Sequence, residues 1–152
     1  MIVGYFKSPI GIVRVSGAPG AVVSVDIQKN VRVVQTARKT RGAVGQALRE
    51  LREYFTGRRK KFSVKLAVRG TPFQKKIWRA MRRIPHGSTV SYREIARRSG
   101  RARAARAAGR AAGANRLCIL IPCHRVVASA GGLGGYAHGL RRKEWLLAHE
   151  RK

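Results

Sequence analysis

The chain has 152 residues, of which 44% are hydrophobic, enough for one core or for two small cores packed together. The chain has 34 Lys and Arg but only 6 Asp and Glu, which gives a net charge of +28. So many cationic side chains repel one another unless a polyanion neutralises them. This balance argues against an ordinary near-neutral soluble domain and favours nucleic acid as the partner, ahead of a membrane surface.

Three classes of protein do not fit the sequence. No apolar run approaches the roughly 18 residues of a membrane span, and the N-terminus lacks the basic start, apolar core and cleavage site of a signal peptide. The two cysteines, Cys118 and Cys123, form neither a disulfide framework nor a zinc motif. We therefore expect a cytoplasmic protein with reduced thiols, no membrane partner, no metal and no cofactor.

The first part of the chain, residues 1–68, is predicted to be a small α/β domain. Partly alternating apolar residues and turn signals predict strands. They comprise two strands within 1–17 joined at Ser8-Pro9 to Gly11, a third over 21–28 and a candidate fourth over 31–34. Apolar residues at helical spacing from Val44 to Phe55 predict a helix that Gly57 ends, and residues 62–68 suit a strand or an extended linker.

Composition changes at Gly70, and residues 69–152 are predicted to be a second, mainly helical domain. Thr71-Pro72 is a helix start, with a capping side chain followed by proline at the first helical position. Ser91 and Glu94 form a capping box before another short helix that Gly100 ends. An alanine-rich helix follows, so the pair predicts a helix-turn-helix.

The alanine-rich helix carries Arg103, Arg106 and Arg110 at spacings i, i+3 and i+7, which place them on one face. Its other residues are nearly all Ala or Gly, so the backbone can approach another surface closely. One interpretation is an ordinary solvated face. Given the net charge, we favour arginines that face phosphates.

The stretch LCILIPCHRVVAS places Cys123 beside His124 after an apolar run and a proline. A thiol attacks as the thiolate, so a nucleophilic Cys123 needs a group that takes its proton. Adjacent side chains of an extended segment point in opposite directions, so either the chain turns here or a water relays the proton. The alternative is a small buried cysteine beside a core histidine.

The closing helix over 139–150 supplies a candidate acid. Glu144 shares a face with Leu140 and Leu147 at i, i+4 and i+7, and a carboxylate on an apolar face needs a partner. It either pairs with Arg141 at the rim or orients His124. The residues alone thus suggest a Cys-His-Glu relay next to a nucleic-acid-binding motif, without a substrate.

Five motifs, in this order, resemble the O6-alkylguanine-DNA alkyltransferases. They are RGTPFQKKIWRAM, IPHGSTVSYREIA, AARAAGRAAGAN, IPCHRVV and GGYAHGLRRKEWLLAHE. The resemblance is close over about residues 69–150 and loose before that. It implies an α+β protein with a ribonuclease H-like N-terminal domain and a C-terminal DNA-binding and alkyl-transfer domain with a winged-helix-like helix-turn-helix.

The resemblance implies a monomer that binds duplex DNA through the minor groove and flips O6-alkylguanine, mainly O6-methylguanine, out of the stack. The alkyl group then moves irreversibly to Cys123. The implied catalytic residues are Cys123, His124 as a water-mediated base, Glu144, Asn115 and Tyr92. Those implied at the DNA are Tyr92, Arg93, Arg101, Arg103, Arg106 as the finger that fills the gap, Arg110 and Ser129. Those implied to line the alkylguanine pocket are Tyr92, Val126, Tyr136, Ala137 and His138, whose bulk is expected to narrow it.

Two other classes of protein remain as alternatives. A non-enzymatic alkyltransferase-like protein would recognise damaged DNA without the cysteine, and Cys123 argues against it. A small basic RNA-binding protein would explain the charge, but it would not require Cys123 beside His124.

Overall fold

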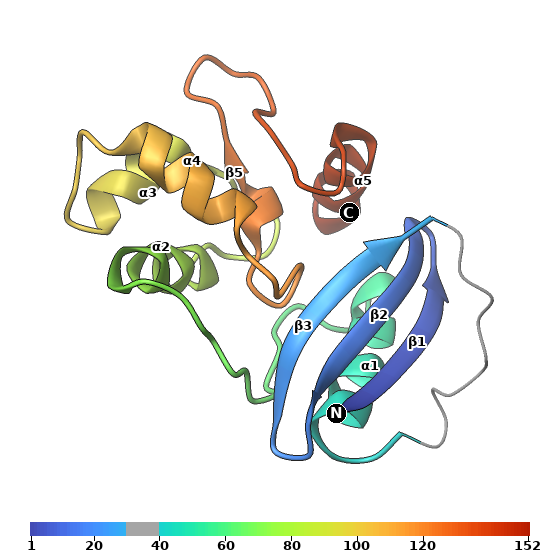
Figure 1. Cartoon of the computed structure of the whole chain (residues 1–152). Helices are drawn as coiled ribbons and strands as arrows, with labels where there is room; N and C mark the ends of the chain where they lie inside the picture. The colour runs from blue at the N-terminus through green and yellow to red at the C-terminus, as the bar shows by residue number, and fades with distance from the viewer. Residues whose placement is uncertain (30–39) are drawn as a thin grey trace. The chain divides into compact units, whose positions relative to one another are not determined.

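The computed structural model describes residues 1–29 and 40–152 (Figure 1). These residues divide into two compact units, Met1–Val68 and Arg69–Lys152. The candidate strand over 31–34 lies outside the described residues. Within the described ranges, no helix is both long and apolar enough to cross a bilayer.

The first unit is a three-stranded antiparallel sheet with one helix packed on it (Figure 1). Its elements are β1 (Ile2–Ser8), β2 (Gly11–Ala18), β3 (Ala21–Gln28) and α1 (Gly42–Phe55). Alternate strand residues point to the same side of a sheet, and Val13, Val15 and Val25 are fully buried in this way. Leu48 and Leu51 of α1 are buried as well, so the predicted helical face supplies the other half of this core.

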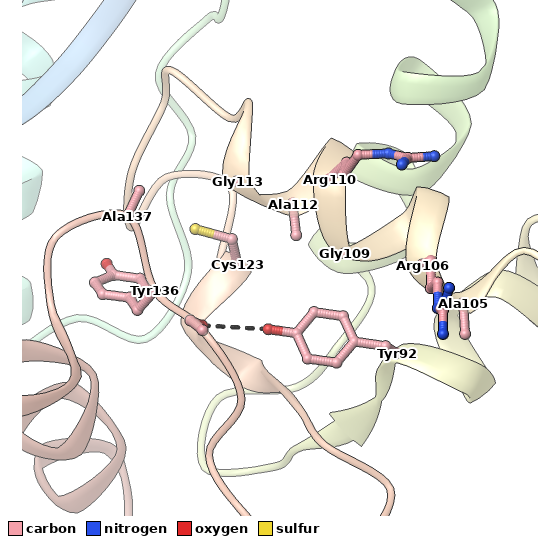
Figure 2. Close-up of a pocket in the computed structure, with 11 residues that line it drawn as sticks. Tyr92, Ala105, Arg106, Gly109, Arg110, Ala112, Gly113, Cys123, Tyr136 and Ala137 are labelled. Carbon is pink, nitrogen blue, oxygen red and sulfur yellow. Dashed lines mark hydrogen bonds between the residues drawn. The ribbon is translucent and has the colours of Figure 1, made fainter.

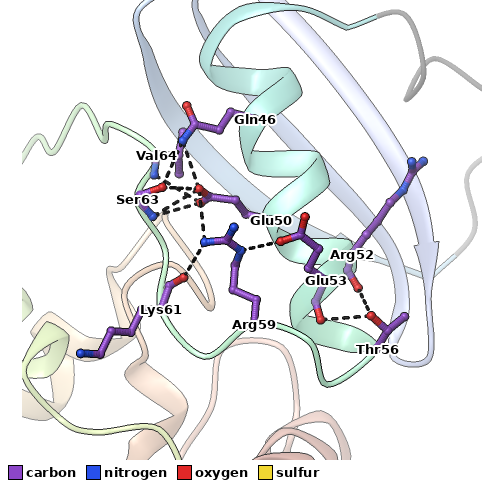
Figure 3. A network of polar contacts seen from close by, with 9 residues as sticks. All are labelled: Gln46, Glu50, Arg52, Glu53, Thr56, Arg59, Lys61, Ser63 and Val64. Atoms are coloured by element: carbon purple, nitrogen blue, oxygen red, sulfur yellow. Dashed lines mark hydrogen bonds and ion pairs between the residues drawn. The ribbon is translucent and has the colours of Figure 1, made fainter.

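A buried carboxylate ties α1 to the segment that follows it (Figure 3). Glu50 accepts hydrogen bonds from the Ser63 hydroxyl at 2.6 Å, from the backbone N–H groups of Ser63 and Val64, and from Gln46. Burial alone would raise the pKa of Glu50, but these hydrogen bonds outweigh it and lower the pKa. Residues 62–68 form neither a helix nor a strand, and among the described residues their one isolated bridge joins Leu66 to Val22.

The second unit consists mainly of helices. Its elements are α2 (Pro72–Arg82), β4 (Val90–Ser91), α3 (Tyr92–Arg98), α4 (Ala105–Gly113), the 3₁₀ turn η1 (Cys123–Arg125), β5 (Val126–Val127) and α5 (Leu140–Glu150). The Thr71 side chain caps α2, and Gln74 completes the capping box. At α3 only half of the predicted box forms, because Glu94 pairs with Arg97 and Arg98 instead of the Ser91 backbone.

Helices α2, α3 and α4 pack together around small residues. Ala108, Ala111 and Ala112 of α4 are buried, and the Trp78 indole of α2 donates a hydrogen bond to the Ala111 carbonyl at 2.8 Å. The short strands β4 and β5 pair in parallel, Val90 opposite Val126. This pairing holds the start of α3 next to the turn that carries Cys123.

Candidate functional site

The backbone around Cys123 makes two tight turns in succession. Residues 117–121 close a turn in which Ile119 has a φ of 70°, a conformation that β-branched residues rarely adopt. The Asn115 side chain braces this turn, donating to the Ile121 carbonyl at 2.9 Å and accepting from the Leu117 N–H at 2.9 Å. Cys123 then begins the 3₁₀ turn, so the extended geometry that would separate it from a base does not hold.

His124 points into the interior and meets an acid there. Its Nε2 lies 2.7 Å from Glu150 Oε1, and both side chains are completely buried. Arg125 donates to both oxygens of Glu150, each at 2.9 Å, and to the Ile84 carbonyl at 2.8 Å. The carboxylate is thus shared between the histidine and a buried guanidinium.

This arrangement corrects the predicted relay. Glu144 is exposed on α5 and does not orient His124. The buried positions of α5 are Lys143, Leu146, Leu147 and Glu150, and Leu140 is 49% exposed. The buried face of α5 is therefore rotated by roughly one residue, about 100°, from the face predicted from Leu140 and Leu147. As a result, Glu150 rather than Glu144 is the acid that contacts His124.

Environment sets the protonation states of these groups. Burial alone would raise the pKa of Glu150, but hydrogen bonds from His124 and Arg125 hold it far below its usual range. Burial lowers the pKa of His124, and the pull of Glu150 only partly opposes this shift. At neutral pH the ring is therefore neutral, and because a carboxylate can only accept, Nε2 carries the ring proton. Nδ1 is left as a basic lone pair.

Burial also determines the state of the thiol. It raises the pKa of Cys123, and the hydrogen bond from Asn115 and the charge of Lys143 only partly offset this shift. Cys123 is therefore a protonated thiol at neutral pH. A neutral thiol and a neutral imidazole on consecutive residues fit a reaction in which the proton leaves as the sulfur attacks.

The Cys123 thiol faces a cavity of about 580 Å³ (Figure 2), within the 300–1,000 Å³ typical of small-ligand sites. The residues that line it are Tyr92, Ala105, Arg106, Gly109, Arg110, Ala112, Gly113, Cys123, Gly135, Tyr136 and Ala137. One wall is the small-residue face of α4, and the opposite wall is the loop that contains Tyr136. The cavity is therefore largely apolar, with two arginines at its α4 side.

Tyr92 and Lys143 fix the loop side of the cavity. The Tyr92 hydroxyl donates to the Gly135 carbonyl at 3.2 Å, and burial raises the pKa of Tyr92, so it stays a donor. The ammonium group of Lys143 donates to the carbonyls of Val126, Leu133 and Gly135. Burial lowers the pKa of Lys143 to about 8. This lysine therefore joins α5 to β5 and to the middle of the loop that follows β5.

The structure brings together only part of the predicted pocket. Tyr92, Tyr136 and Ala137 line the cavity, whereas Val126 and His138 are not among its described lining residues. Val126 is completely buried, and its backbone pairs with Val90. The His138 ring packs edge-on against Tyr136, with ring centres 5.6 Å apart, so His138 lies behind a lining residue of the cavity.

The predicted DNA-contacting arginines fall into two groups. Arg106 and Arg110 line the cavity from α4. Arg103 precedes α4, which begins at Ala105, so the predicted row of three arginines on one helical face is wrong. The others lie outside the cavity: Arg93 and Ser129 are exposed, and the Arg101 guanidinium lies 5.1 Å from the Phe73 ring centre.

Sequence reasoning missed Glu150, Arg125 and Lys143. The signal was present in α5, because Lys143, Leu146, Leu147 and Glu150 follow the spacing i, i+3, i+4 and i+7 of a buried face. Lys143 and Glu150 are charged residues on this otherwise apolar face, which indicates that each has a hydrogen-bond or ion-pair partner in the interior.

Comparisons with known proteins give the same picture over the whole chain. The family model of the 6-O-methylguanine DNA methyltransferase DNA binding domain matches residues 72–152, and that of its ribonuclease-like domain matches residues 1–68. The methylated-DNA–protein-cysteine methyltransferase of Methanosarcina acetivorans is 40% identical, over 99% of this chain and 98% of that protein. The corresponding protein of Mycobacterium tuberculosis H37Rv is 41% identical, over 95% of this chain and 88% of that protein.

Solved structures agree in fold. The crystal structure of the M. tuberculosis O6-methylguanine methyltransferase has a TM-score of 0.85 at 38% identity and covers 99% of this chain and 93% of that chain. A structure of the M. tuberculosis protein in complex with DNA has a TM-score of 0.86 at 37% identity, over 98% and 92% of the two chains. The chain thus belongs to the 6-O-methylguanine DNA methyltransferase family, whose known function is the suicide transfer of an alkyl group from DNA to a cysteine of the protein.

Proposed function

We propose that this chain repairs O6-alkylguanine, mainly O6-methylguanine, by moving the alkyl group to Cys123 in a single turnover. The observation that carries the proposal is the Cys123 thiol, which faces the cavity next to the buried His124–Glu150 pair. The sulfur bonds to the alkyl carbon, the bond from that carbon to guanine O6 breaks, and guanine is restored. The thioether is stable, so each molecule acts once.

The thiol proton leaves through a water to His124. In support of this route, Nδ1 of His124 is buried and has no hydrogen-bond partner among residues 1–29 and 40–152. It is also the ring nitrogen that carries no proton. As the ring becomes an imidazolium, Glu150 stabilises the charge across 2.7 Å, while Asn115 holds the turn that positions the sulfur.

The departing guanine gains a proton, and Tyr92 is placed to supply it. Its hydroxyl lies on the cavity wall with its proton directed to the Gly135 carbonyl. A bound base offers an alternative acceptor. After the transfer, a proton returns to Tyr92 from solvent, and the His124 imidazolium releases the former thiol proton to solvent.

The duplex lies against α4 through its minor groove, and Arg106 enters the stack as the base leaves it. Small residues on the cavity side of α4 support a close approach of the helix backbone, and Arg106 is exposed at the cavity. Base flipping costs a few kcal/mol, least where pairing is already weakened by the lesion. The further contacts to phosphates come from Arg93, Arg101, Arg103, Arg110 and Ser129.

The protein acts as a monomer in the cytoplasm. All residues of the relay and the cavity come from one unit of one chain, which supports a monomer. A nucleophilic thiol also needs a reducing compartment.

The test is mass spectrometry after mixing with a duplex that carries one O6-methylguanine. Cys118 and Cys123 fall in the same tryptic peptide, residues 117–125, so fragment ions must locate the methyl group. We expect one added methyl on Cys123, none with Cys123→Ser, and an unchanged result with the matched Cys118→Ser variant. Tight binding to the lesion without a mass change would instead support a non-enzymatic damage-recognition protein.

A further inference from the structure

Helix α2 carries a group of cations on a face that the proposed reaction does not use. Five exposed cations lie along the helix and at its C-cap: Lys75, Lys76, Arg79, Arg82 and Arg83. We call these five residues the α2 basic face. At 100° per residue they lie on one side of the helix, opposite the buried residues of α2.

Within the described part of the second unit, no acid pairs with this face. The acids of residues 69–152 are Glu94, Glu144 and Glu150. Glu94 pairs with arginines of its own helix, and the other two belong to α5. Among the described residues, no ion pair involves the α2 basic face. Five cations within about 12 Å of helix length repel one another, and such a cost is relieved by a polyanion.

The α2 basic face and the cavity lie on different sides of the helical layer. Helix α2 turns its buried side toward α4, where Trp78 reaches the Ala111 carbonyl. Helix α4 likewise turns its buried alanines inward and presents Arg106 and Arg110 to the cavity. Helices α2 and α4 lie next to each other in Figure 1. Because they meet through their buried sides, their charged faces point away from each other. Two helix layers, about 20 Å, separate the faces.

We propose that the α2 basic face binds the phosphate backbone of a second segment of duplex DNA while α4 holds the first. This inference rests on the proposed function, in which a duplex occupies the cavity side. Lys and Arg side chains reach phosphates without reading bases, so the second contact is independent of sequence. A protein that holds two segments moves between them without complete release, which shortens the search for rare lesions.

The test compares two variants that lose the same charge. In the first, the residues of the α2 basic face are replaced as K75Q/K76Q/R79Q/R82Q/R83Q; Gln has a helix propensity close to those of Lys and Arg, so α2 is retained. In the control, five exposed cations of the first unit are replaced as K7Q/R49Q/R58Q/K60Q/K65Q. Both variants have a net charge lower by 5 than the +28 of the chain.

Two readouts separate the second contact from the first. Energy transfer between donor- and acceptor-labelled 16-base-pair duplexes reports bridging, and stopped-flow release from a labelled duplex at rising competitor concentration reports direct transfer. For the unmodified protein and the control, we expect energy transfer and a release rate that rises with competitor. For the α2 variant, we expect no energy transfer and a release rate independent of competitor, while methyl transfer at saturating lesion duplex stays within about twofold.

Three results would overturn the inference. The first is bridging by the α2 variant at the level of the unmodified protein. The second is an equal loss in the control, which would point to total charge. The third is a parallel loss of affinity for one short lesion duplex, which would place α2 on the first segment. Absence of methyl transfer in the unmodified protein would overturn the proposed function instead, whatever the bridging result.

Discussion

The strongest test of the site is to remove the charge of Glu150 while keeping its shape. In Glu150→Gln, the side-chain oxygen can still accept from His124 Nε2, but the carboxylate that faces the developing imidazolium is gone. At 2.7 Å and complete burial this is a charge-assisted hydrogen bond, for which a net worth of about 1.5–3 kcal/mol is typical. The loss corresponds to a rate of methyl transfer roughly 10- to 150-fold lower.

The same change affects stability, because Arg125 loses its buried counter-charge. Breaking a buried ion pair from one side costs about 3 kcal/mol or more. For a chain of this size, that lowers Tm by roughly 6–12 °C. The rate must therefore be measured well below the transition of the variant, with its folded state checked by circular dichroism.

The assay is single-turnover transfer, sampled by rapid quench and intact-protein mass spectrometry. Glu144→Gln is the matched control, since Glu144 is exposed on the same helix, and we expect its rate and Tm to equal those of the unmodified protein. The reasoning is refuted if Glu150→Gln, while folded, transfers methyl at the unmodified rate, or if Glu144→Gln is the slower variant.

Three further predictions follow from other parts of the structure. Arg106→Ala should slow repair in duplex DNA far more than reaction with free O6-benzylguanine, because only the duplex leaves a gap to fill; equal slowing of both reactions in quenched time courses would contradict the finger role. Burial lowers the pKa of His124, so the ring stays neutral and the transfer rate should hold as pH falls through 6.5, declining only below it; a decline centred at 6.5 or above would contradict this protonation state. Glu50→Ala should destabilise the first unit by about 2–4 kcal/mol, because several donors lose a buried acceptor. Since the pKa of Glu50 is lowered on folding, its contribution to the free energy of unfolding is present above the unfolded pKa near 4.3 and is lost as the pH falls below that value. Denaturant titrations at pH 7 and pH 3 should therefore show that the difference in unfolding free energy between variant and unmodified protein shrinks at pH 3. An equal difference at both pH values would contradict this account.

Much of the fold was predictable, because local signals and tertiary packing agree there. Thr71-Pro72 starts α2 as expected, and alternation over 21–28 marks β3. The alanine-rich helix was predicted to include Arg103, but it begins at Ala105. Ala and Arg favour a helix about equally on either side of Ala105, so propensity does not mark the boundary. The turn after Gly100 decides the boundary, and it depends on contacts between α3 and α4.

The site was predictable where a motif is local and not where a partner comes from another element. Cys123 and His124 are neighbours in the sequence, so their association required no knowledge of the fold. Glu150 meets His124 only through the packing of α5 on η1, and a helix can present any of several faces to a core. Leu140 suggested one face, but its position at the exposed start of α5 frees it from the interior.

The burial that keeps Cys123 protonated also determines how long an unused molecule lasts. Peroxides and small electrophiles react with thiolates far more readily than with thiols. Each molecule reacts with one alkyl group only, and oxidation of its thiol to a sulfinic acid is irreversible, so an oxidised molecule is lost for repair. Because burial keeps Cys123, the proposed nucleophile, as a thiol, each unused copy stays able to accept an alkyl group until it meets a lesion.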